Sequence, residues 1–154
     1  MSDSAPVTLK HIARVGELLD MMATELSRRG VVHDASKFDP IEKGPLDEMQ
    51  RLVDKEGPAP YGTEEYRRRT ALLGPMLEHH YAHNSHHPEH YGSRGIAGMD
   101  LFDLIEMWAD WKAASERGAE SAMNLSYSIE KHGIPPMLAD VLRNTADRLG
   151  WAVK

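Results

Sequence analysis

The stretch TLKHIARVGELLDMMATEL, residues 8–26, places an apolar side chain at every third or fourth position. This spacing puts the apolar side chains on one face of an α-helix. Thr8 can cap the start of this helix, and Gly30 stands where a glycine commonly ends one. The pattern therefore predicts a first helix from about Thr8 to Gly30, with His11 in its first turn.

The same periodicity recurs along the rest of the chain. Helices are predicted over about 40–55, from Thr63 onward with a kink at Pro75, and over about 101–117, 119–131 and 136–149. Loops are predicted at 56–62 and 87–98. Because no alternating β-branched run exceeds a few residues, strands are not expected. We predict an all-α bundle of about five to seven helices, forming one domain over 1–154 with its core at about 9–145.

Composition limits the function. The chain has 154 residues, a formal net charge of −6 and no cysteine. The negative charge argues against general nucleic-acid binding, and the run Arg67-Arg68-Arg69 is interpreted as a solvated helix face. Without thiolates, a bound metal must be held by His, Asp or Glu, which favours Mn, Fe, Ni, Co, Mg or catalytic Zn.

Location and assembly are also expectations from the sequence. The start, MSDSAPVTLKH, has no apolar signal core, and no segment reaches the ~20 apolar residues of a membrane span. We expect a cytoplasmic protein with no membrane partner, bacterial or phage-encoded. Trp108, Trp111 and Trp151 can serve either a core or a homodimer interface.

Six histidines lie within the twelve residues 79–90, in the run HHYAHNSHHPEH. Imidazole is the commonest metal ligand and the side chain that carries protons near neutral pH. His79 and His83, and likewise His83 and His87, are separated by one helical turn, a spacing that can chelate a metal. We interpret the run as one wall of a metal site, in which His79 and His90 can be bystanders.

Two other segments carry candidate ligands. His33 and Asp34 are adjacent, and Lys37 follows one turn later, where its ammonium could contact an anionic substrate beside a metal. In the predicted helix over 101–117, Asp110 stands between two tryptophans, and such a carboxylate is expected to be partly buried against a cation. Asp103, on the same helix, is interpreted as part of a solvated stripe.

The order His11, His33-Asp34, Asp110 resembles the H…HD…D signature of the HD-domain superfamily of metal-dependent phosphohydrolases. The chain also resembles a little-studied family of small HD-like proteins common in bacteriophages and bacteria. That likeness rests on three motifs, which here are HDASKF (33–38), HHYAHNSHHPEH (79–90) and EMWADWKA (106–113). It covers about residues 9–145 and implies an all-α fold with one or two divalent metal ions.

The resemblance also implies roles for individual residues. The metal ligands it implies are His11, His33, Asp34, His80, His86, His87 and Asp110. Contacts to substrate are expected from Lys37, Asn84 and Lys112. Glu42 or His83 would transfer protons during the reaction. Glu89 and Glu106 would accept a hydrogen bond from the second ring nitrogen of a ligating histidine and so fix its tautomer.

The function expected from these residues is hydrolysis of a small nucleotide or related phosphate ester. A divalent metal would lower the pKa of its water and supply hydroxide near neutral pH. Two alternatives stay open at this point: an HD-fold di-iron oxygenase, and a protein that binds a nucleotide or a partner without turnover.

Overall fold

The computed structural model describes residues 3–117 and 122–154, and the chain divides into two compact units, Met1–His33 and Asp34–Lys154. The described residues form seven α-helices and two 3₁₀ helices, and contain no strand beyond one isolated bridge. The predicted all-α class is confirmed. A single domain over the whole chain stays a prediction.

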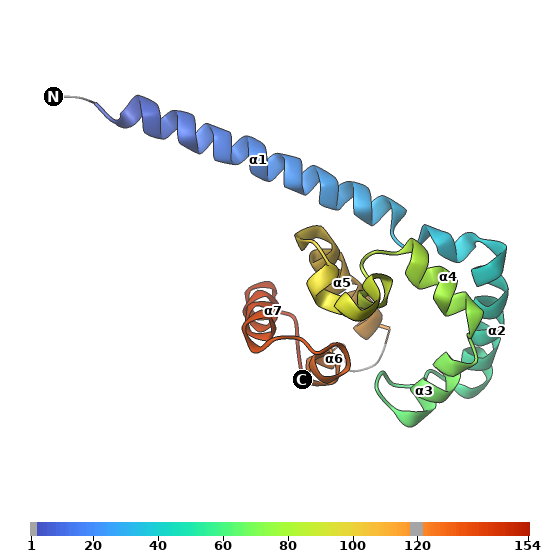
Figure 1. Cartoon of the computed structure of the whole chain (residues 1–154). Coiled ribbons are helices and arrows are strands. Elements are labelled where there is room, and N and C mark those ends of the chain that lie inside the picture. The colour runs from blue at the N-terminus through green and yellow to red at the C-terminus, as the bar shows by residue number, and fades with distance from the viewer. Residues whose placement is uncertain (1–2, 118–121) are drawn as a thin grey trace. The chain divides into compact units, whose positions relative to one another are not determined.

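The first unit is one long helix, α1 (Ala5–Val32), which Figure 1 shows as an unbroken rod. The prediction that Gly30 ends this helix is wrong. A glycine ends a helix by taking a left-handed conformation, and Gly30 is not among the residues with positive φ. The helix instead ends at Val32, and the next residue, His33, has an extended ψ of 129°.

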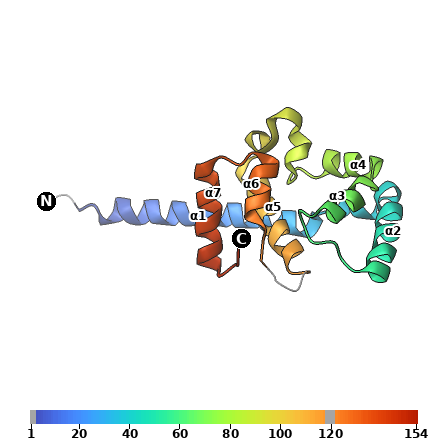
Figure 2. The ribbon, with the colours of Figure 1, turned by 90° about the horizontal axis from the view of Figure 1, so that it is seen from below.

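The second unit holds the remaining elements, which Figures 1 and 2 label. They are η1 (Ala35–Phe38), α2 (Pro40–Glu56), α3 (Glu64–Ala71), α4 (Pro75–His83), η2 (Pro88–Gly98), α5 (Leu101–Ser115), α6 (Leu125–His132) and α7 (Pro136–Leu149). Both views gather α2, α3 and α4 at one end of this unit and α6 and α7 at the other.

Several helix boundaries follow from local sequence. Thr63 caps α3, since its hydroxyl accepts the backbone N–H of Tyr66 at 3.1 Å. The predicted kink at Pro75 is a complete break, because Gly74 takes a φ of 43° between α3 and α4. The predicted start of a helix at 119 lies outside the described residues, and α6 begins at Leu125.

The main core of the second unit lies between α5, α6 and α7. Its buried residues are Trp108, Met123, Leu125, Ile134, Ala139, Leu142 and Ala146. Trp111 and Trp151 pack against this core, which contains Trp108. All three tryptophans therefore have packing partners within the same chain. The core fixes the position of α5, the helix that carries Glu106 and Asp110. None of the described helices has the length and apolarity needed to cross a membrane.

Candidate metal centre

A sharp turn presents Asp34 at the start of the second unit. Its φ of 55° is left-handed, and among the described residues other than glycine it alone has a positive φ. Aspartate tolerates this conformation better than most residues. The turn continues into η1, and Lys37 Nζ lies 2.5 Å from Asp34 Oδ2. The lysine therefore pairs with the outer carboxylate oxygen.

A buried glutamate orients the first histidine of the site. Glu42, on α2, has no exposed surface, and its two carboxylate oxygens lie 2.7 Å from Nδ1 of His79 and 2.8 Å from Nδ1 of His80. Burial by itself raises the pKa of Glu42, but hydrogen bonds from His79, Ser36 and His80 lower it below its usual value. The ionised carboxylate can only accept, so Nδ1 of His80 donates to it.

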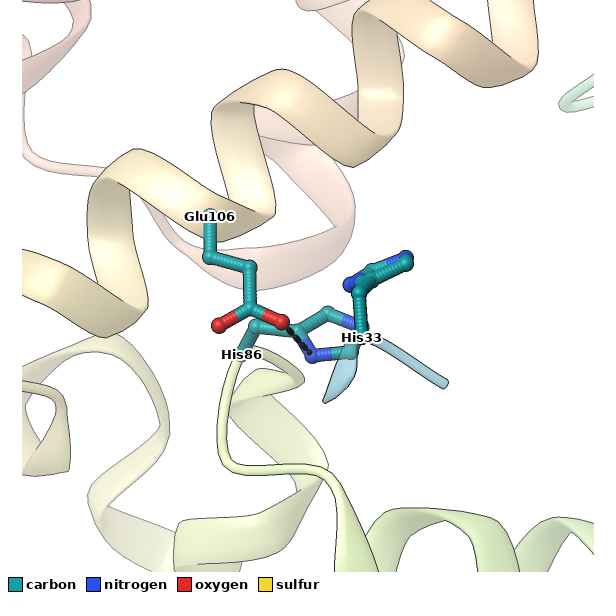
Figure 3. A group of neighbouring side chains, drawn as sticks. All are labelled: His33, His86 and Glu106. Atoms are coloured by element: carbon teal, nitrogen blue, oxygen red, sulfur yellow. Dashed lines mark ion pairs between the residues drawn. The ribbon is translucent and has the colours of Figure 1, made fainter. Parts of the chain in front are cut away.

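A second glutamate makes the same kind of contact with Nδ1 of a second histidine. Glu106, on α5, places Oε1 3.1 Å from Nδ1 of His86, and Figure 3 shows the carboxylate directed at that ring. His86 is 2% exposed. In both pairs the carboxylate contacts Nδ1, so Nε2 lies on the side of the imidazole ring away from the carboxylate. This is the arrangement by which outer carboxylates fix the tautomer of metal-binding histidines.

The two Nε2 atoms converge on one oxygen. Oδ1 of Asp34 lies 3.4 Å from Nε2 of His80 and 3.5 Å from Nε2 of His86. His87 joins them, since its Nε2 lies 2.9 Å from Nε2 of His80. Asp34, His80 and His87 each offer a ligand atom, and these three atoms lie within 4.8 Å of one another.

These separations suit a metal ion. With metal–ligand bonds of about 2.1 Å, neighbouring ligand atoms lie about 3.0 Å apart in octahedral geometry and about 3.4 Å apart in tetrahedral geometry. The observed distances of 2.9, 3.4 and 3.5 Å fall close to this interval. A set of imidazole nitrogens and carboxylate oxygens fits divalent Zn, Fe, Mn, Co or Ni.

The protonation of His87 also suits a ligand. Its pKa is lowered to about 3, mainly by burial and then by electrostatic interaction with the neighbouring His86 and His80. His87 is therefore neutral near pH 7, which is the form that binds metals.

Asp110 stands at the edge of this group. Asp110 on α5 is half-buried, as predicted, and a ligand atom of its carboxylate lies within 4.8 Å of one from Asp34. His33 is the last residue of the first unit, and its peptide bond attaches it to Asp34. Figure 3 labels His33 together with His86 and Glu106.

Asp103 anchors the loop that carries His86 and His87. One of its oxygens accepts the hydroxyl of Ser85 at 2.6 Å, and the other accepts the Tyr91 hydroxyl at 2.5 Å. Asp103 also completes a capping box with Asp100. The interpretation of Asp103 as part of a solvated stripe is wrong, because the residue is 3% exposed. Its partners lie 12 and 18 residues away, so helical periodicity could not reveal this role.

Other predicted site residues make contacts outside the ligand group. His83 Nδ1 donates to the carbonyl of His79 at 2.8 Å, Lys112 pairs with Glu116 at 3.0 Å, and Glu89 pairs with Lys131 at 3.3 Å. α1 keeps His11 about 32 Å from Val32 at a rise of about 1.5 Å per residue, so the structure does not bring it to His33.

Asn84 and His79 make structural contacts that the sequence did not predict. The Asn84 amide donates to Ser36 Oγ at 2.7 Å and to the His80 carbonyl at 2.8 Å, so it ties η1 to α4. His79, interpreted as a bystander, holds the second oxygen of Glu42. The only sequence signal for this contact is that His79 and His80 are adjacent at the start of the histidine run.

Comparison with known proteins shows which family the chain is similar to, and it gives no activity. The sequence model of a family of unknown function, DUF5662, matches residues 2–148. No curated protein and no solved structure is significantly similar to the chain.

Proposed function

The chain belongs to the DUF5662 family, whose function is unknown, and from its own geometry we propose that it is a metal-dependent phosphohydrolase acting on a small nucleotide or related phosphate ester. The observation that carries the proposal is the convergence of Nε2 of His80 and His86 on Oδ1 of Asp34. Each histidine is backed by a carboxylate on Nδ1, an arrangement that is typical of metal-binding histidines.

The ion would be held by Asp34, His80 and His87, with His86 and Asp110 available to complete the shell or to hold a second ion. When bound, the metal would lower the pKa of a coordinated water and polarise a phosphoryl oxygen. Glu42 would act by orienting His80, because it is fully buried and both of its oxygens are engaged by histidines.

Lys37 supplies the positive charge expected next to a phosphate. Its ammonium pairs with Oδ2 of Asp34, while Oδ1 faces the histidines. The lysine ammonium and the proposed ion would therefore contact the two different oxygens of one carboxylate. It would offset charge that develops on the non-bridging oxygens of the substrate.

The same ligands also support a second candidate, a non-haem iron oxygenase. Asp34, His80 and His87 form a group of two histidines and one carboxylate. That composition is typical of iron(II) oxygenases, which keep the other positions of the metal open. Metal identity and oxygen dependence distinguish the two enzymes.

The test begins with the metal content of protein purified without chelators, measured for the wild type and for His80→Gln. His90→Gln is a matched control from the same histidine run, since His90 is exposed and its Nδ1 donates to the Tyr81 carbonyl. We expect bound divalent metal in the wild type and the control, and at least a tenfold loss in His80→Gln. A wild-type protein that binds no divalent metal would refute both candidates.

Activity is then screened by phosphate release from nucleotides and phosphate esters, with oxygen uptake measured in parallel. Metal-dependent phosphate release that is lost in His80→Gln would support the hydrolase. Oxygen uptake by the iron form, without phosphate release, would favour the oxygenase. Tight nucleotide binding with neither reaction would indicate a binding protein.

A further inference from the structure

Tyr81 lies against the histidines of the candidate metal centre. It follows His80 directly on α4, and its ring centroid is 6.0 Å from that of His80 and 5.2 Å from that of His87. Aromatic rings at these separations are in contact. Among the tyrosines that the structure describes, Tyr81 alone pairs its ring with a histidine of the proposed ligand group. A molecule bound to the ion would therefore lie beside this phenol.

The backbone of Tyr81 is held from outside its helix. Carbonyl groups in the last turn of a helix have no partner within that helix. In the last turn of α4, the His80 carbonyl accepts the Asn84 amide at 2.8 Å. The next carbonyl, that of Tyr81, accepts Nδ1 of His90 at 2.7 Å. Since His90 belongs to η2, this second bond ties Tyr81 to the element that follows His87.

The Tyr81 hydroxyl makes no hydrogen bond to any residue of the described chain, 3–117 and 122–154. The side chain is half-buried, yet its oxygen is not one of the buried atoms that lack a partner, so the hydroxyl reaches solvent. Tyr91 provides a contrast, because its hydroxyl is committed to Asp103. The hydroxyl of Tyr81 is therefore a donor that a bound molecule can use.

Neighbouring neutral donors are already engaged. The Asn84 amide donates to the His80 carbonyl, and the Ser85 hydroxyl donates to Asp103 at 2.6 Å. A phosphoryl group bound to the ion has further anionic oxygens, and donors aimed at them stabilise their charge. With an ordinary pKa of about 10, a phenol is protonated near neutral pH and can donate.

The charges near the loop permit an anion at this place. Glu89 follows His87 by two residues and is the acidic side chain of η2. Lys131 of α6 lies 3.3 Å from its carboxylate, so that negative charge is offset. An incoming phosphoryl group would meet a balanced pair here rather than an isolated carboxylate.

We propose that Tyr81 is a substrate-binding residue of the metal centre, whose hydroxyl donates a hydrogen bond to a non-bridging oxygen of the phosphoryl group. The inference rests on the proposed phosphohydrolase function and adds to it the residue that holds the substrate on the side of His87. Lys37 would act from the side of Asp34 Oδ2, which its ammonium contacts. The role of the phenol is a hydrogen bond, and the phenol keeps its proton.

The test measures binding of inorganic phosphate to the full chain, loaded with divalent metal, by isothermal titration calorimetry. Tyr81→Phe removes the hydroxyl and keeps the ring. Because hydrogen bonds to charged groups are among the stronger ones, phosphate binding should weaken by about 10–100-fold. Metal content should stay at the wild-type level. Tyr127→Phe is the matched control, since Tyr127 is a half-buried phenol that packs on Tyr61, and it should bind phosphate as the wild type does.

The phosphate-release assay gives a second reading of the same variant. A hydrogen bond present in both the bound substrate and the transition state raises KM when it is lost and leaves kcat nearly unchanged. Wild-type phosphate affinity or wild-type KM in Tyr81→Phe would overturn the role of Tyr81 and leave the proposed function standing. Loss of metal from Tyr81→Phe would also overturn it, because the hydroxyl would then support the ion. A wild type that holds no metal would refute the proposed function, and this inference with it.

Discussion

Nε2 of His80 and Nε2 of His87 lie 2.9 Å apart, although both belong to neutral or cationic rings that gain little from facing each other directly. Nδ1 of His80 is already engaged by Glu42 at 2.8 Å, so its Nε2 carries the lone pair when the ring is neutral. Two such nitrogens at this separation can share one proton or bind one ion. The nearby Oδ1 of Asp34, at 3.4 Å from Nε2 of His80, adds a carboxylate oxygen that would stabilise either cation.

Asp34→Asn is expected to remove the metal while the helices persist. Asparagine accepts the left-handed φ of 55° as readily as aspartate, but it lacks the charge that faces the two histidines. Metal affinity should fall by at least about 100-fold, with an unchanged helical circular dichroism spectrum. Metal content at wild-type level in Asp34→Asn would contradict the ligand assignment.

Glu42→Gln is expected to weaken metal binding by about 10–100-fold, the usual effect of losing a carboxylate behind a ligating histidine. The amide cannot stabilise the donor tautomer of His80 as an ionised carboxylate does. Competition titration with a metal-sensitive dye measures the change. Glu48→Gln, an exposed position on the same helix, is the matched control and should bind as the wild type does. Equal affinities for the two variants would show that Glu42 does not position His80.

Tyr91→Phe is expected to loosen the loop that carries His86 and His87. The change removes a hydrogen bond to the buried, ionisable Asp103, and such bonds contribute about 1.5–3 kcal/mol. The free energy of unfolding should fall by about that amount in chemical denaturation. Ser93→Ala, at an exposed position in η2, should leave it unchanged. An unaltered stability of Tyr91→Phe would show that this contact does not hold the loop.

Metal-free protein is expected to lose stability as the pH falls below about 6.5. The pKa of His87 is about 3 in the folded chain and 6.5 in its ordinary state, so between these values the unfolded chain binds a proton that the folded chain does not. The free energy of unfolding therefore decreases with falling pH over this window. Thermal melting in chelator from pH 7 to pH 4 measures it.

His87→Gln is the companion variant for that experiment. It removes the titrating group, so its melting temperature should depend less steeply on pH across the same window. A slope identical to that of the wild type would mean that His87 is not the group that titrates.

Local sequence was sufficient for the all-α class and for the starts of the helices at about 63 and 101, because these features depend on neighbouring residues. The density of histidine, visible without a structure, also drew attention to His80, His86 and His87, which the structure brings close to Asp34. Local sequence missed the contacts of Glu42 with His79 and of Asp103 with Tyr91. Each of these joins different elements, and helical spacing carries no information about such contacts.

α1 runs unbroken from Ala5 to Val32, so His11 and Val32 of one molecule stay about 32 Å apart. Because Asp34 follows Val32 by only two residues, an ion bound at Asp34 would have to take its other ligands from His80, His87 and their neighbours, without His11 of the same molecule.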